Sequence, residues 1–274
     1  ECCRYPATGN MDLKQGTMEC WFAPAADMNG SWRQVMAVVG AKSDMQVYYL
    51  PGPEQQLAMP VNSGGKQLSA AAKNLQLAPG KFAHVAVTWS DKIRLFVDGK
   101  LAATLDTTLP PDLDESPAKF RLMLGCPRDW RGYTKVIVDD FRVSRTVRYT
   151  GDYAVPTAAF GTDADTLLLD HFDNYGLKNE GGVGKADAWV HFAPGKFGQA
   201  ATWEPGQGRM RLDELAEQGV RTICFHEHWV PYQSYPHVAD ADRPKLHSLV
   251  EGIHARKLNL LLYMSRQFAD NCPE

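Results

Sequence analysis

The chain has 274 residues, of which 44% are hydrophobic and 22% charged, and its formal net charge is -3. These values are typical of a globular protein with a real core, organised as one large or two ordinary domains. There is no basic block, which argues against a nucleic-acid surface or an anionic-membrane anchor, and no apolar run approaches the roughly 20 residues that span a bilayer.

The sequence begins with Glu1 and shows no signal-peptide pattern, so we expect a processed form or a fragment. The spacing of the six cysteines fits no zinc site. Cys20 and Cys224 fall within predicted strands, where we expect buried free thiols. The sequence does not assign partners to Cys2 and Cys3.

From Gly16 to about Phe172 the chain consists of short alternating runs separated by Gly, Pro, Asn and Asp, such as "GTMECWFAP", "KFAHVAVTW" and "KVIVDDFRVS". Many short strands at turn-marked spacing predict an antiparallel β-sandwich or jelly roll. The clearest unit is "IRLFVDGKLAATL", in which Asp98-Gly99 predicts a tight hairpin turn. Strand periodicity places Ile93, Leu95 and Val97 on one face.

Two polar residues fall among these apolar positions. In "KVIVDDFRVS" strict alternation places Asp139 on the same face as Phe141 and Val143. One interpretation is a structural carboxylate that accepts backbone or Trp21 indole hydrogen bonds, and the other is a calcium ligand completed by loop oxygens. We favour the first, because one carboxylate is a poor calcium site. For His84 we expect a packed, hydrogen-bonded side chain.

Three blocks of sequence, "GTMECWF", "FAHVAVTWSDKIRLFVDGKLAATL" and "VIVDDFRVS", resemble in order and spacing the laminin-G-like, concanavalin A-like jelly-roll family. The resemblance covers roughly residues 10–172, and we assign residues 1–172 to this domain. It implies two curved antiparallel sheets in a module that is often carbohydrate-binding or structural. Such modules sometimes hold a calcium ion, for which Asp139 is the candidate ligand here.

Sugar binding by such a module would use exposed aromatic side chains, and the candidates are Trp32, Tyr48, Tyr49, Trp130 and Tyr133. Trp130 and Tyr133 lie in the predicted loop "CPRDWRGYTK", where aromatic rings are plausible stacking platforms. They are equally plausible lids over the rim of the sandwich or contacts to a second domain. We favour the contact slightly, because joined domains bury surface at their junction.

Residues 173–209 are rich in glycine and short of apolar runs, which indicates a linker. The phrase "PGKFGQAATW" resembles the opening of further laminin-G-like modules. A degenerate second module is therefore the alternative for this segment.

Residues 210–274 follow a different pattern. The strand "RTICFHE" is followed by a helical stripe from Leu246 to Ile253 and by a second apolar strand, "LNLLLYMS". Near-continuous apolar strands joined by a helix predict a parallel βαβ unit, so the fold class is mainly β with a small α/β piece. This piece resembles the first units of a glycoside-hydrolase-type (β/α)8 barrel.

In such barrels the chemistry lies at the carboxyl ends of the strands. Alternation turns Cys224 and His226 toward the barrel interior, and Ile223 and Phe225 toward the helix. The candidate substrate-binding residues at these ends are His226, Glu227, His228, Trp229, Tyr232 and Tyr263.

Three interpretations of His226 and His228 stay open. They contact sugar hydroxyls, with Trp229 or Tyr232 stacking on the ring, or they bind a metal as in amidohydrolase-type barrels, or they cap the strand. We place the sugar contact first.

About 65 residues are too few for a closed barrel, which needs about 200. The resemblance places the acid and the nucleophile on later strands, so we name no catalytic residue and expect these 274 residues alone to be inactive. We predict a part of a longer, secreted or periplasmic glycoside hydrolase that acts on a poly- or oligosaccharide. The alternatives are a non-catalytic carbohydrate-binding or structural module and, less favoured, a metal-dependent hydrolase that uses the His-x-His pair.

Overall fold

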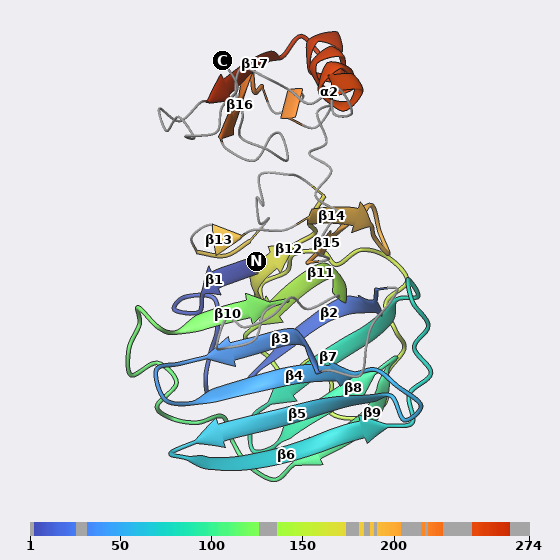
Figure 1. Ribbon diagram of the computed structural model, residues 1–274. Helices are drawn as coiled ribbons and strands as arrows, with labels where there is room; N and C mark the ends of the chain where they lie inside the picture. Colours follow the sequence, from blue (N-terminus) through green and yellow to red (C-terminus); the bar gives the residue numbers. More distant parts are fainter. Residues whose placement is uncertain are drawn as a thin grey trace, which may run out of the picture. The chain divides into compact units, whose positions relative to one another are not determined.

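The computed structural model describes residues 3–25, 32–125, 136–173, 181–183, 187–188, 191–203, 215–216, 219–226 and 243–263. The chain divides into two compact units, Glu1–Gly208 and Arg209–Glu274. The first unit is a sandwich of two antiparallel sheets, as predicted from the alternating runs (Figure 1).

One sheet of the sandwich has seven strands in the order β13-β1-β10-β3-β4-β5-β6. Each neighbouring pair is antiparallel. The strands are β1 (Cys3–Pro6), β3 (Arg33–Val39), β4 (Asp44–Leu50), β5 (Gln56–Ser63), β6 (Lys66–Lys73), β10 (Arg121–Leu124) and β13 (Asp187–Ala188).

The other sheet has eight strands in the order β14-β15-β11-β2-β7-β8-β9, and β12 pairs with a further part of β11. The strands are β2 (Gly16–Pro24), β7 (Ala83–Trp89), β8 (Ile93–Val97), β9 (Lys100–Leu105), β11 (Val136–Ser144), β12 (Thr166–Asp170), β14 (His191–Pro194) and β15 (Gln199–Thr202).

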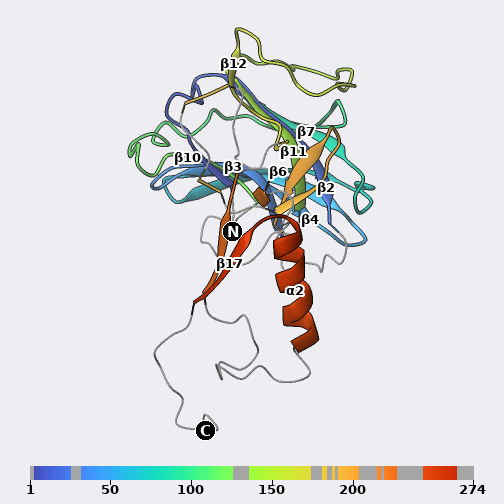
Figure 2. The ribbon, with the colours of Figure 1, turned by 90° about the horizontal axis from the view of Figure 1, so that it is seen from above.

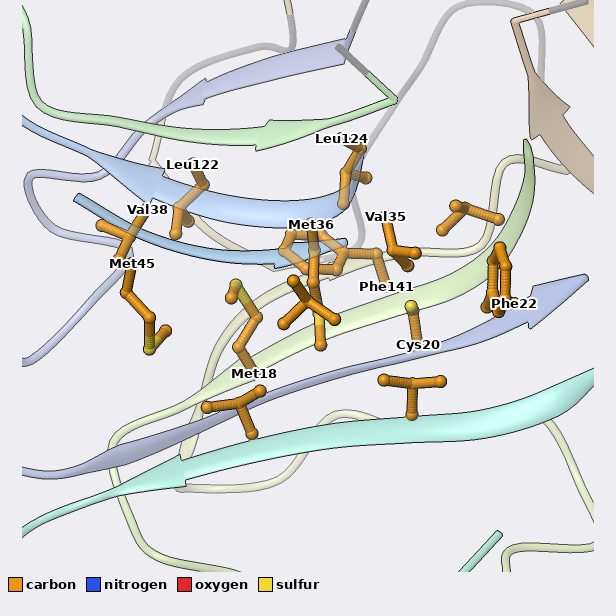
Figure 3. Close-up of a cluster of buried hydrophobic side chains, with 14 of the residues drawn as sticks. Met18, Cys20, Phe22, Val35, Met36, Val38, Met45, Leu122, Leu124 and Phe141 are labelled. Carbon is orange, nitrogen blue, oxygen red and sulfur yellow. The ribbon is translucent and has the colours of Figure 1, made fainter. Parts of the chain in front are cut away.

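The core lies between the two sheets, where alternate residues of each strand point inward. Figure 3 shows Met18, Cys20 and Phe22 of β2 facing Met36 of β3 and Met45 of β4 across this space. Cys20 is a buried free thiol, as expected.

The Asp98-Gly99 turn joins β8 to β9 as predicted. Both residues have positive φ, 47° at Asp98 and 74° at Gly99, as a type I′ hairpin requires. Ile93, Leu95 and Val97 are all buried in the core.

A β-bulge in β11 overturns the predicted alternation around Asp139. The register with β2 shifts between Asp139 and Arg142, and Asp140 has a φ of 49°. The extra residue turns Phe141 and Val143 into the core and leaves Asp139 beside Trp21 on the outer face. Because Asp140, and not a glycine, adopts this positive-φ conformation, the sequence carries no glycine that would mark the bulge.

The described part of residues 173–209 does not form the linker that the sequence indicated. β14 and β15 form a hairpin that pairs with β11, and β13 pairs with β1. Trp203 follows β15, is fully buried in the core and leaves no room for a Cβ at Gly125. The sandwich therefore extends past residue 172.

In the second unit the chain runs from β16 (Thr222–His226) through α2 (Arg243–Ala255) to β17 (Asn259–Tyr263). The two strands pair with each other in parallel. Figure 2 shows the helix beside the strand pair. Ile223 packs with Ile253 of the helix, as the alternation predicted. Cys224 lies in its predicted strand, but it is exposed rather than buried, because it faces away from the helix. No helix in the described part of the chain has the length and apolar character needed to cross a membrane.

Candidate functional site

The outer face of the seven-stranded sheet carries an ordered set of polar side chains. In β4 the inward residues Met45 and Val47 belong to the core, so Asp44, Gln46 and Tyr48 point outward. Directly opposite Asp44 on β5 lies Asn62.

These four outward side chains form one hydrogen-bonded chain. Gln46 Nε2 donates to Asp44 Oδ1 at 2.7 Å, and Asn62 Nδ2 donates to the same oxygen at 2.6 Å. The Tyr48 hydroxyl donates to Gln46 Oε1. The chain fixes the position of Tyr48, whose side chain is partly accessible.

Gln34 on β3 lies directly opposite Tyr48 and is fully buried. Among the described residues, neither its amide nitrogen nor its amide oxygen has a hydrogen-bond partner. Such a group costs free energy unless water or a ligand satisfies it.

Sequence reasoning missed Gln34 because strict alternation groups it with the core residues Met36 and Val38. A register shift between Gln34 and Met36 turns Val35 and Met36 both inward, which leaves Gln34 outside. No residue in "RQVMAVV" signals that bulge.

Two of the aromatic candidates meet beside this amide. The rings of Trp32 and Tyr48 are 6.4 Å apart in an edge-on arrangement, and Trp32 is 46% exposed. Tyr49 instead points into the core and packs against Phe22. Trp130 and Tyr133 lie outside the described residues.

The outer face of the eight-stranded sheet has a different construction, centred on Glu19 of β2. Arg142 Nε and Nη2 lie 2.9 and 2.8 Å from Glu19 Oε1. His84 Nε2 lies 3.1 Å from Oε2, to which the Tyr149 hydroxyl donates at 2.8 Å. His84 Nδ1 is 2.8 Å from the Tyr153 hydroxyl, so His84 is packed and hydrogen-bonded, as predicted.

Residues 145–165, here called the covering segment, close this face. Tyr149 and Tyr153 stack on each other, and both rings meet His84 and Phe96 edge-on. Glu19 is completely buried as a result. Burial raises the pKa of Glu19, but contact with His84 and the charge of Arg142 outweigh it and hold that pKa below its ordinary value.

Asp139 also lies on this side, with both carboxylate oxygens occupied. Its Oδ1 accepts from the Asp140 amide at 2.8 Å, and its Oδ2 accepts from the amides of Lys196 and Phe197 at 2.7 and 2.9 Å. These bonds hold the β14–β15 turn against β11. Burial, together with the neighbouring Asp140, raises the pKa of Asp139 to about 7, although the amide donors oppose the rise.

These contacts are those of a structural carboxylate, with backbone amides as donors in place of the Trp21 indole. Among the described residues no group of three or more His, Cys, Asp or Glu side chains is arranged to hold a metal ion. The calcium interpretation of Asp139 stays an untested prediction.

Of the candidates in the second unit, His226 and Tyr263 are brought together as neighbours in register at the carboxyl ends of β16 and β17. The structure describes the backbone of these two residues. Glu227, His228, Trp229 and Tyr232 lie outside the described residues, so the sugar-contact, metal and capping interpretations stay predictions.

Comparison with known proteins places the first unit in a family. A family model described as "Concanavalin A-like lectin/glucanases superfamily" (Laminin_G_3) matches residues 4–150. No curated protein matches the chain.

Several solved structures match part of the chain at low identity and low TM-score. A sialidase CBM40 from Ruminococcus gnavus bound to α2,6 sialyllactose is 17% identical, with 50% of this chain and 80% of that chain covered and a TM-score of 0.39. The LG4-5 domains of the mouse laminin α1 chain are 14% identical, with 57% and 44% covered and a TM-score of 0.40.

The full-length tailspike protein 2 of Escherichia coli O157:H7 bacteriophage CAB120 is 13% identical, with a TM-score of 0.36; the match covers 51% of this chain and 21% of the tailspike. This chain therefore spans about a fifth of that protein.

Proposed function

The chain belongs to the concanavalin A-like lectin/glucanases superfamily, and we propose that its sandwich binds a saccharide on the outer face of the seven-stranded sheet. The contacts come from the exposed Trp32 and the partly accessible Tyr48, and from Gln34, which is fully buried in the free chain, once its neighbours move aside to admit the ligand. The observation that carries the proposal is the Gln34 amide, which is buried, lies directly opposite Tyr48 and has no hydrogen-bond partner in the part of the chain that the structure describes.

The chemistry of this group of side chains suits a sugar. A pyranose ring has apolar C–H faces that stack on aromatic rings and an edge of hydroxyls that both donate and accept hydrogen bonds. Trp32 offers an exposed ring, and the Gln34 amide offers two N–H donors and a carbonyl acceptor. The Asp44–Gln46–Tyr48 chain holds the neighbouring hydroxyl in place before any ligand arrives.

The experiment is a glycan-array screen of the full chain, followed by the affinity of the best glycan for Trp32→Ala. We expect Trp32→Ala to weaken binding by about tenfold or more, because the stacking ring is lost. The matched control is Leu68→Ala, which removes a 50%-exposed apolar side chain from β6 at a position paired with the inward Val61. Equal affinities of the two variants, or no glycan bound at all, would contradict the proposal.

We also propose that the second unit is the opening of a (β/α)8 barrel in a longer, secreted glycoside hydrolase. The supporting observation is that β16 and β17, which are connected through α2, pair in parallel, with His226 and Tyr263 as neighbours in register at the strand ends. Activity on polysaccharides is then expected from a longer product of the same reading frame and not from residues 1–274. Turnover by residues 1–274 alone would contradict the expectation that activity needs the longer product. A longer product without further βα units would contradict the barrel proposal.

A further inference from the structure

The outer face of the seven-stranded sheet divides into a covered half and an accessible half. On β3 and β10 the outward residues Ala37, Val39 and Met123 form a small buried cluster of their own. On β5 and β6, the last two strands of this sheet, the outward side chains are accessible in part or in full (Figure 1). Tyr48 of β4 lies between the two halves, so a ligand that contacts Tyr48 finds accessible surface on the side of β6.

The accessible half carries small side chains next to Tyr48. Alternate residues of β5 belong to the core, which turns Ala58 and Pro60 outward. Their partners on β6 are Ala71 and Ser69. These four residues, here called the small-residue strip, have no long side chain to rise above the sheet. The strip therefore leaves a low surface on which a flat molecule can lie.

The strip continues the row of paired positions that contains the proposed saccharide site. Gln34 lies directly opposite Tyr48. Tyr48 in turn lies opposite Ala58, which lies opposite Ala71. Neighbouring strands are about 4.8 Å apart, so this row crosses roughly 14 Å of the sheet from β3 to β6.

A strip of small residues does not by itself indicate a ligand, and the second observation is the Gln34 amide at the head of the row. It is fully buried, two residues from the exposed Trp32, and has no hydrogen-bond partner among the residues described. A buried amide of this kind indicates that a bound molecule contacts this end of the row.

We infer that the sandwich binds an extended oligosaccharide, which lies across the strands from Trp32 toward β6 and contacts the protein through about three sugar rings. This inference rests on the proposed saccharide function of the same face. The first ring stacks beside Trp32 and Tyr48, the second lies over Ala58, and the third lies over Ala71.

The straight course of the row favours one kind of linkage. Pyranose chains with equatorial linkages, such as cello- and xylo-oligosaccharides, are straight ribbons in which each ring advances by about one strand spacing, about 5 Å. Their apolar ring faces can rest on the alanine methyl groups and on the Pro60 ring. Malto-oligosaccharides coil because one bond of each linkage is axial, so such a chain leaves the row after its first ring.

The test measures the affinity of the full chain for cello-, xylo-, chito- and malto-oligosaccharides of increasing length by NMR titration and calorimetry. For at least one of the three equatorially linked series we expect affinity to rise about tenfold between one sugar residue and three, because two more apolar ring faces are buried. Further residues should add little. The malto series should gain less than about threefold over the same lengths.

Two substitutions on the strip locate the second and third rings. Isoleucine suits a strand, and its stiff β-branched side chain cannot fold away from the row. In Ala71→Ile the gain in affinity should stop at the disaccharide. In Ala58→Ile it should stop at the monosaccharide, whose own affinity should stay within about twofold of the parent value.

The matched control is Gln67→Ile. Gln67 is an exposed outward residue of β6, like Ala71, but it lies opposite Asn62 and outside the row. It receives the same new side chain on the same strand, so the full gain in affinity with length should be retained.

The outcomes separate this inference from the function on which it rests. If no saccharide binds, or if Trp32→Ala leaves binding unchanged, the saccharide function fails. If binding depends on Trp32 but no equatorially linked series gains affinity from one residue to three, the saccharide function stands and the extended ligand is overturned. The same holds if Gln67→Ile removes the gain as fully as Ala71→Ile.

Discussion

The two outer faces of the sandwich carry similar polar side chains in opposite circumstances. On the eight-stranded sheet the Glu19 carboxylate has Arg142, His84 and Tyr149 around it, and the covering segment closes over them. On the seven-stranded sheet the Gln34 amide, two residues from the exposed Trp32, is buried and has no hydrogen-bond partner among the residues described. A satisfied network stabilises the fold, whereas an unsatisfied group is retained where binding satisfies it.

The strongest way to test this contrast is to remove Glu19. Glu19→Gln leaves the buried Arg142 without its counter-ion and should lower the free energy of unfolding by about 3–5 kcal/mol, measured by urea unfolding. The matched control is Asp163→Asn, which removes the charge from the exposed partner of Arg148 and should cost less than about 1 kcal/mol. Equal losses in the two variants would contradict a central role for Glu19.

Trp203→Ala tests whether the last strands belong to the sandwich. Because the ring is fully buried against Gly125, its loss should cost about 3–5 kcal/mol in the unfolding transition of the first unit. A loss of unfolding free energy below about 1 kcal/mol would contradict the assignment of β14, β15 and Trp203 to the sandwich. Leu101→Ala, at an exposed position in edge strand β9, is the control.

The raised pKa of Asp139 should make the free energy of unfolding depend on pH. Its folded pKa of about 7 lies above the unfolded value of about 4, so the folded chain binds the extra proton between these values. Stability from this group is fully present below about pH 4, falls as pH rises and is lost above about pH 7, by about 2–4 kcal/mol in total. Asp139→Asn should flatten this part of the stability–pH curve, and an unchanged curve would assign the titration elsewhere.

Trp32→Ala should show the smallest effect on folding. Its side chain is 46% exposed, so the free energy of unfolding should change by no more than about 0.5 kcal/mol while saccharide affinity falls. A destabilisation of 2 kcal/mol or more would make Trp32 a structural residue and weaken the contrast between the faces.

The features that the sequence predicted are those with local signals. The Asp98-Gly99 turn, the alternating strands and the parallel βαβ unit depend on neighbouring residues, and each is present. The packing of Ile223 against the helix followed from the same periodicity.

The features that it missed depend on bulges and on long-range pairing. A shift at Gln34 and another at Asp140 each reverse the alternation, and neither contains a glycine or proline to mark it. β14 and β15 looked like a linker because their pairing with β11 joins residues about 60 positions apart. The candidate site therefore became visible only from the register of β3 with β4.

A role for Gln34 in binding rather than in folding can be tested by measuring the stability and the saccharide affinity of Gln34→Met together. Methionine has a similar length and no polar group to satisfy, so we predict that the free energy of unfolding stays level or rises by about 1 kcal/mol. We predict that affinity for the best array glycan falls about tenfold, because the amide contacts are lost. A variant that is clearly less stable and binds the glycan as well as the parent chain would show that Gln34 serves the fold and that the site lies elsewhere.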